Sequence, residues 1–312
     1  MSFTEQVKNE LARLERQEKG ERLAEILALM RMSASIVSGS RNAWGLEFST
    51  GHGAVARRVL VSLKRDFGFT PATMVRQGRK LRKKNVYTLM VGPSPEGLAF
   101  MKHMGLSPLL PARDSERLEG EEERRAYLAG AFLGGGSVSR PQSDYHLEMV
   151  TQSQSFAGEI VKVMQFFGLK GKMTDRKNDY IVYLKDGDQV GGFLQITGAA
   201  QSYLEFESVR VMKDMRNRVN RQVNCETANL AKTVDAAVRH TYKVRRLLQY
   251  RTLNSLPDRI RETCEARLRY PNASMAELAA VLGISKSGLA HRFKRISDLV
   301  SRISGDTRED TR

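Results

Sequence analysis

Two side chains with metal-binding chemistry lie close together in the sequence, His146 and Glu148. They are two residues apart in a stretch with strand-like alternation, so both would point to the same face of a sheet. A divalent cation held there could promote cleavage of a phosphodiester, and Glu123 and Asp144 are the other acids nearby. One imidazole and one carboxylate seldom hold a metal alone. We therefore keep a nuclease with displaced acids as an alternative only, and expect no metal and no cofactor.

The element that would position such a site is a helix rich in small residues. Residues 128–137 read LAGAFLGGGS, which resembles the LAGLIDADG helix of homing endonucleases. In that pattern the eighth residue is an aspartate that holds the catalytic metal, and here it is Gly135. Residues 25–35 (EILALMRMSAS) occupy the matching place in the first half, where the acid position is Ser33. The resemblance implies two closely crossing helices in a fold that has lost its catalytic acids.

The chain repeats itself with a register of one hundred residues. Each half reads helix, strand pair, helix, strand pair, helix, with hairpin turns expected at Lys84-Asn85 and Asn178-Asp179. The fold class predicted is α+β, with a two-repeat homing-endonuclease-like part, a helical linker and an all-α helix-turn-helix domain. The expected segments are a first repeat, a second repeat with a basic strip, a linker helix and the helix-turn-helix domain: 1–108, 109–222, 223–252 and 253–312.

The composition favours a polyanion as the partner. The 312 residues carry a formal net charge of +16, which is common in nucleic-acid proteins but shared by membrane-surface and RNA-binding proteins. No apolar run is long enough to span a bilayer, and the amphipathic start of the chain lacks the apolar core of a signal peptide. Two distant cysteines suggest a reducing compartment. We expect a cytoplasmic, nucleoid-associated protein.

The last sixty residues carry the pattern of a helix-turn-helix. Ser274 and Glu277 form a capping box at the start of one helix, and Gly283 can adopt the left-handed backbone that ends it. Ser285 is placed to cap a second helix over residues 286–300. The apolar spacing predicts a three-helix core made of these inward positions: Leu256, Ile260, Cys264, Leu268, Leu278, Ala279, Leu282, Leu289, Phe293 and Ile296.

The second helix of this motif would read DNA through its first turns. Lys286, Ser287 and His291 are the candidates for contacts with base edges. Residues farther along or at the flanks are candidates for phosphate contacts, namely Arg292, Lys294 and Arg295. The competing interpretation is a solvated basic face without sequence preference.

Two further basic segments are candidate phosphate contacts. The first repeat has an acid-free cluster at its hairpin that includes Arg79 and Lys83. The segment 210–221 could form an extended cationic strip with Arg210, Arg216, Arg218 and Arg221. A solvated loop or linker explains either equally well, and Asn224 or Thr227 could simply cap a long helix from about Ala228 to Leu248.

Residues 217–233 (NRVNRQVNCETANLAKT) resemble the signature of the WhiA family. With the LAGAFLGGGS helix, the degenerate first repeat and the terminal helix-turn-helix in the same order, the resemblance covers nearly the whole chain. It implies a non-catalytic DNA-binding transcription regulator of Gram-positive bacteria, with a role in sporulation or in cell division and chromosome segregation. The implied partner is double-stranded DNA, and a protein co-regulator is compatible with it. An RNA-binding protein is a further alternative, although aromatic stacking platforms are few.

Overall fold

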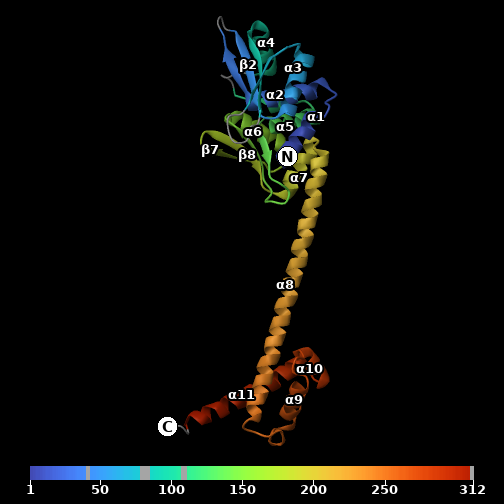
Figure 1. The fold of residues 1–312 in the computed structure, drawn as a ribbon, viewed down its shortest axis with the longest axis vertical. Helices are drawn as coiled ribbons and strands as arrows, with labels where there is room; N and C mark the ends of the chain where they lie inside the picture. The colour runs from blue at the N-terminus through green and yellow to red at the C-terminus, as the bar shows by residue number, and fades with distance from the viewer. Residues whose placement is uncertain (40–42, 78–84, 107–110, 310–312) are drawn as a thin grey trace. The chain divides into compact units, whose positions relative to one another are not determined.

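The computed structural model describes residues 1–39, 43–77, 85–106 and 111–309. Its contacts divide the chain into two compact units, Met1–Asp214 and Met215–Arg312. The first unit contains both antiparallel sheets, and the second is helical (Figure 1). The fold class is therefore α+β, as predicted.

The first unit consists of two copies of one arrangement, and each copy has the predicted order of elements. The first comprises α2 (Lys19–Ser33), β1 (Ala34–Ser38), β2 (Trp44–Thr50), α3 (Gly53–Phe67), β3 (Ala72–Gln77), β4 (Asn85–Ser94) and α4 (Pro95–Met104). The second comprises α5 (Glu121–Gly135), β5 (Gly136–Val138), β6 (Leu147–Thr151), α6 (Gln154–Phe166), β7 (Lys172–Arg176), β8 (Asp179–Leu184) and α7 (Gly187–Thr197). The sheets have matching strand orders, β1-β2-β4-β3 and β5-β6-β8-β7.

The hairpin between β7 and β8 turns one residue earlier than predicted. Lys177 and Asn178 have φ of 52° and 71°, and β8 already begins at Asp179. Two consecutive positive φ angles are what a two-residue type I′ turn requires, and asparagine adopts them more easily than most residues. The corresponding turn predicted at Lys84-Asn85 falls partly outside the described residues.

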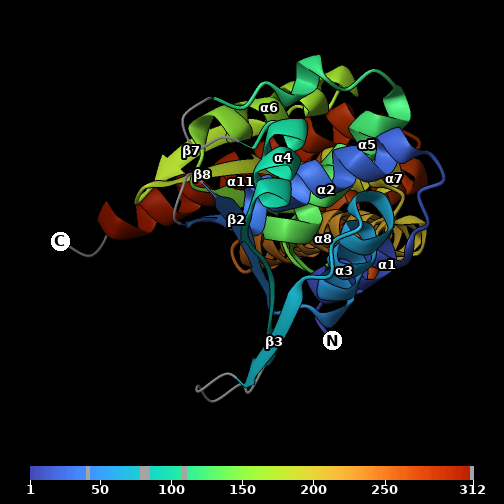
Figure 2. The same ribbon diagram turned by 90° about the horizontal axis from the view of Figure 1, so that it is seen from above.

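Helices α2 and α5 lie side by side at the centre of the first unit (Figure 2). A Cβ built on Gly130 of α5 would overlap the carbonyl oxygen of Glu25 and lie 2.9 Å from its carbonyl carbon. Two helix backbones can approach this closely only where one of them has no side chain. Gly130 therefore allows the close helix crossing that the resemblance to the LAGLIDADG helix implied.

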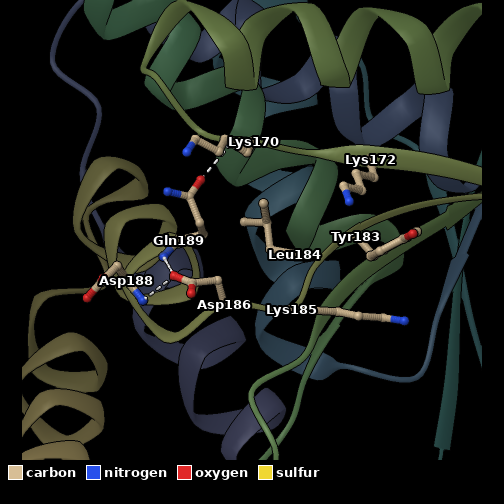
Figure 3. A pocket seen from close by; sticks show the side chains of 8 residues that line it. All are labelled: Lys170, Lys172, Tyr183, Leu184, Lys185, Asp186, Asp188 and Gln189. Atoms are coloured by element: carbon tan, nitrogen blue, oxygen red, sulfur yellow. Dashed lines mark hydrogen bonds between the residues drawn. The ribbon is translucent and has the colours of Figure 1, made fainter.

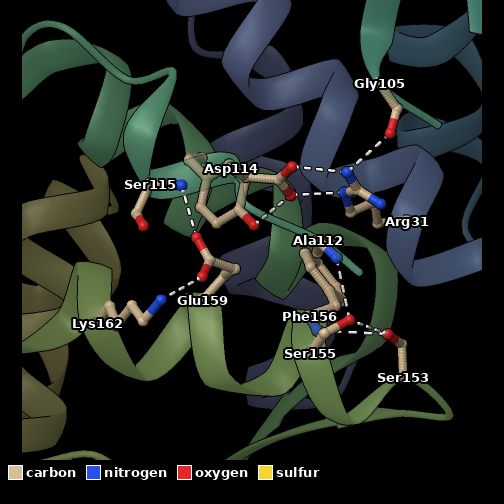
Figure 4. Close-up of polar contacts among 11 residues, drawn as sticks. Arg31, Gly105, Ala112, Asp114, Ser115, Ser153, Ser155, Phe156, Glu159 and Lys162 are labelled. Atoms are coloured by element: carbon tan, nitrogen blue, oxygen red, sulfur yellow. Dashed lines mark hydrogen bonds and ion pairs between the residues drawn. The ribbon is translucent and has the colours of Figure 1, made fainter. Parts of the chain in front are cut away.

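A buried polar cluster ties the segment between the repeats to both central helices (Figure 4). Asp114, in the short 3-10 helix η2 (Asp114–Glu116), is fully buried. Arg31 of α2 donates from Nη2 to Asp114 Oδ1 at 2.7 Å, and its Nε lies 2.6 Å from Oδ2. Tyr127 of α5 donates its hydroxyl to Oδ2 at 2.7 Å. One carboxylate thus joins the two repeats.

A further helix at the start of the chain packs one face against the core of the first unit. Helix α1 (Phe3–Arg13) begins at a capping box formed by Ser2 and Glu5. Its buried face includes Val7 and Leu11, both without exposed surface. Within the described residues, no helix is both long and apolar enough to cross a membrane.

The second unit contains the predicted helix-turn-helix. It is built from η3 (Leu253–Ser255), α9 (Asp258–Arg269), α10 (Met275–Val281) and α11 (Lys286–Glu309). The capping box of Ser274 and Glu277 is present, Gly283 has φ 62°, and Ser285 Oγ accepts the amide of Gly288. All ten predicted inward positions belong to or pack against one core.

Helix α8 (Ala200–Leu248) runs through the boundary between the units and differs from the prediction. The extended strip and the helix start near Ala228 are both wrong, because the whole segment is one helix of 49 residues. No glycine or proline occurs between Gly198 and Pro257, so nothing local interrupts it. Asn224 and Thr227 are good capping residues, but they lie in the helix interior.

Candidate nucleic-acid interface

The two positions that are acidic in homing endonucleases are the last residues of their helices, Ser33 in α2 and Gly135 in α5. A Cβ built on Gly135 would lie 2.8 Å from the carbonyl oxygen of Val150 in β6 and against the side chain of Met32. An aspartate therefore does not fit at position 135 unless the neighbouring strand moves. The packing has closed the place where a metal ligand would project.

A cavity of about 480 Å³ lies beside these helix ends. Its lining includes four hydroxyl side chains, one basic residue and one acidic residue: Ser33, Ser35, Thr151, Ser153, Arg31 and Asp179. Among the described lining residues Asp179 is the one acid. Hydroxyls bind hard divalent cations far less well than carboxylates do. The cavity thus offers hydrogen bonds, and its donor set does not fit a catalytic magnesium.

The candidate replacement acids do not gather into one cluster. His146 Nε2 and Glu148 Oε2 are 3.1 Å apart, and Glu148 Oε1 also accepts a hydrogen bond from Ser137. Glu123 lies in the first turn of α5, about 18 Å along the helix from Gly135. Over the described part of the chain, no three His, Cys, Asp or Glu side chains come together in a way that could hold a metal.

The β7-β8 edge of the second sheet forms a basic hollow of about 650 Å³ (Figure 3). Lys172 is paired across the strands with Tyr183, and Lys185 Nζ lies 4.9 Å from the Tyr183 ring centroid. Lys170 adds a third cation to the lining. Sequence reasoning did not single out these residues. The signal that could have found them is their period-two spacing in the basic stretch before α7.

Both acids that line this hollow already have partners, and the three lysines outnumber them. Asp186 caps α7 by accepting the amides of Asp188 and Gln189 at 2.9 and 3.2 Å. Asp188 forms an ion pair with Arg210 at 2.6 Å. A surface with an excess of lysines beside an aromatic ring is suited to contacts with the phosphate backbone of a nucleic acid.

The predicted reading face of α11 is exposed. Its apolar positions Leu289, Phe293 and Ile296 are buried. Five of the six candidate contacts on this helix are exposed: Lys286, Ser287, His291, Lys294 and Arg295. The structure brings these residues together on one helix, with the base-reading candidates in its first turns.

Arg292 differs from the other candidates on α11. Its side chain is 16 % exposed and turns toward α9, where Nη1 donates to the carbonyl of Arg259 at 3.1 Å. The same nitrogen lies 3.3 Å from Glu262 Oε2. These contacts assign Arg292 to holding the two helices together, a placement that its position in the sequence could not reveal.

The candidates on α8 also fall into two groups. Arg210 is engaged with Asp188 and Glu207 and is partly buried. Arg216, Arg218 and Arg221 are exposed, but Arg216 and Arg218 lie roughly 200° apart around the helix. A single cationic rail therefore does not form. Arg79 and Lys83 lie outside the described residues.

Behind the reading helix, His240 of α8 stacks on Phe293 of α11, with ring centroids 3.9 Å apart and planes 7° apart. Burial, and then the charges of Arg267, Lys243 and Arg239, lower the pKa of His240 to about 4. In the unfolded chain its pKa is about 6.5. The folded state therefore holds this imidazole neutral.

We expect the second unit to lose stability as the pH falls from about 6.5 to about 4. In that window the unfolded chain binds a proton that the folded unit does not, whereas above it neither state is protonated. Amide hydrogen exchange in α9 and α10 of the full chain, followed against pH, measures the effect. His240→Gln should flatten the dependence, and an unchanged profile in that variant would contradict the assignment.

Comparison with known proteins gives one consistent result. The chain matches the models of the WhiA N-terminal LAGLIDADG-like domain over residues 19–107, the WhiA LAGLIDADG-like domain over 124–216 and the WhiA C-terminal HTH domain over 219–300. A Heliobacterium modesticaldum protein named "Probable cell division protein WhiA" is 41% identical over 99% of this chain and 100% of its own length. A Clostridium botulinum protein of the same name is 38% identical over 97% and 99%.

A solved structure shows the same fold. The crystal structure of full-length WhiA from Thermatoga maritima covers 97% of this chain and 99% of its own, with a TM-score of 0.58 and 22% identity.

Proposed function

The chain belongs to the WhiA family, and from that premise we propose that it is a non-catalytic DNA-binding transcription regulator that acts in cell division. The name of the relatives supports the process, and the helix-turn-helix supports the partner. Such a protein would associate with the nucleoid. The family resemblance also allows a role in sporulation, and it allows a protein co-regulator as a partner.

The observation that carries the proposal is the exposed face at the start of α11. A capped helix with Lys286, Ser287 and His291 in its first turns has the dimensions and donors of a major-groove reader. Arginine and asparagine, the strongest readers of guanine and adenine, do not occur in that first turn. We therefore propose modest sequence preference from this helix, with Lys294 and Arg295 on phosphates.

Replacing Lys286 and His291 with alanine tests the reading face. A target sequence would first come from chromatin immunoprecipitation with sequencing. We expect the double variant to lose roughly 1 to 3 kcal/mol per lost base contact on that target and almost nothing on random duplex. Arg302→Ala is the control, because it removes an exposed cation from the same helix far from its start. Equal losses on both kinds of DNA would make these residues phosphate contacts instead.

In this proposal the first unit adds affinity for DNA that does not depend on sequence. The hollow formed by Lys170, Lys172 and Lys185 would contact the DNA backbone without reading sequence. Each phosphate contact adds about 0.9 to the slope of log affinity against log salt. A salt titration of the full chain with Lys172→Ala and Lys185→Ala should therefore show a shallower slope and an unchanged preference for the target.

The absence of cleavage is the other part of the proposal. It is supported by Ser33 and Gly135 at the two acid positions and by the close contact of Gly135 with β6. Glu148 is the acid that the alternative nuclease would use, and it is bonded to His146 and Ser137.

We expect supercoiled plasmid to stay intact with the purified protein and Mg²⁺ or Mn²⁺. The reason is that a hard cation needs several carboxylate oxygens to be held over a phosphate. Agarose gel electrophoresis measures nicking. Nicking that co-purifies with the chain and disappears in Glu148→Gln would show that the alternative is correct.

A further inference from the structure

Helix α8 carries an exposed apolar stripe within the second unit. Met215, Val219, Val223, Leu230 and Val234 are each between 49% and 64% exposed. At about 100° per residue they fall within roughly 100° of the helix circumference. Five large apolar side chains aligned on about 30 Å of one helix are far more than the isolated apolar residues of an ordinary surface.

The same face of α8 is already used for packing farther along the helix. Ala237 and Val244 continue the stripe and are buried in the core of the helix-turn-helix domain. The exposed part therefore has the side-chain pattern of a helix that packs against another element. Covering these side chains with another apolar surface would be favourable.

We propose that a second copy of this chain covers the stripe, with its own α8 packed antiparallel. The spacing carries the choice of partner. The positions 215, 219, 223, 226, 230 and 234 are separated by four, four, three, four and four residues, which reads the same in both directions. A twofold axis at the midpoint therefore places Met215 against Val234 of the other copy, and Val219 against its Leu230.

The charges favour the antiparallel direction. In a parallel pair Glu226, at the centre of the stripe, would face Glu226 of the other copy, and Arg216 at its edge would face Arg216. In the antiparallel pair Glu226 faces Val223 of the other copy. Within its own helix, the Glu226 carboxylate accepts a hydrogen bond from the side-chain amide of Gln222 at 3.0 Å. The two Arg216 side chains are then about 25 Å apart along the helices.

Most cations of this segment lie away from the stripe. Arg218, Arg221 and Lys232 occupy the opposite half of the helix and are exposed. They would stay outside the paired surface. If the proposed function holds, the twofold axis also predicts that the target DNA is an inverted repeat; self-association itself does not depend on that function.

Sedimentation equilibrium of the full chain without DNA tests the pairing. The wild type should dimerise, and Val219→Glu or Leu230→Arg alone should weaken the dimer by at least about tenfold, because each places a charge in the apolar seam twice. The double variant Val219→Glu with Leu230→Arg should recover much of the affinity. In the antiparallel pair, the acid at 219 meets the base at 230 of the other copy.

Ala228→Glu is the matched control, because this exposed residue lies on the opposite side of the same helix and should leave the dimer unchanged. Circular dichroism would verify that every variant keeps its helix. A wild type that stays monomeric at high micromolar concentration would overturn the proposal, whether or not it binds DNA or another protein. Failure of the double variant to recover affinity would overturn the antiparallel direction.

Discussion

Gly130→Ala is expected to destabilise the first unit by about 3 kcal/mol or more. The added methyl group would enter the backbone of α2 at Glu25, and a carbonyl group cannot turn aside as a flexible side chain can. Overpacking of this kind typically costs about 1 to 3 kcal/mol, and contact with backbone places this site at the upper end. The helix-propensity gain of replacing glycine by alanine, up to about 1 kcal/mol, is too small to offset it.

Urea unfolding followed by tryptophan fluorescence measures this effect in the full chain. Trp44, in β2, is the single tryptophan, so its emission reports on the first unit. Gly158→Ala is the matched control, because Gly158 lies within α6 and a Cβ there meets nothing within 4 Å. That variant should be as stable as the wild type or slightly more stable. Equal midpoints for the two variants would contradict the close crossing of α2 and α5.

Asp114→Asn is expected to cost about 3 to 5 kcal/mol. The substitution removes the charge that compensates Arg31 in a fully buried position, and a buried cation without its partner is strongly unfavourable. Tyr127 does not replace that charge, because burial raises the pKa of its hydroxyl, which stays protonated. The same tryptophan-monitored unfolding gives the free energy.

Asp188→Asn provides the comparison at the surface. Its ion pair with Arg210 has a similar distance of 2.6 Å, but the Asp188 side chain is 76% exposed. Exposed pairs contribute only about 0 to 1 kcal/mol. A loss for Asp114→Asn no larger than the loss for Asp188→Asn would mean that the buried cluster does not hold the repeats together.

The local elements of this protein could be predicted because their signals are local. The order of helices and strands in both repeats follows from the spacing of apolar residues and from the glycines that end helices. Gly68, Gly105 and Gly198 all have positive φ at the ends of their helices. The capping box of Ser274 and the turn at Gly283 likewise depend only on residues within one or two turns.

Helix α8 shows where local signals mislead. Asn224 and Thr227 favour helix starts, and the many basic residues before them resemble a linker. The backbone continues through them as a helix because no glycine or proline stops it. Once the segment is helical, its apolar residues line up as one stripe, a pattern that an extended strand would have divided between two faces.

The amino-acid sequence by itself determined the repeat, the helix-turn-helix and the loss of acids at Ser33 and Gly135, since each depends on residue type and short-range spacing. The tertiary structure decided which charged side chains remain for a ligand. Arg292 turns to α9 and Arg210 to Asp188, whereas Lys286 and Lys172 face outward. The direction of a long cationic side chain depends on acceptors that are distant in sequence, and only the folded chain brings those acceptors within reach.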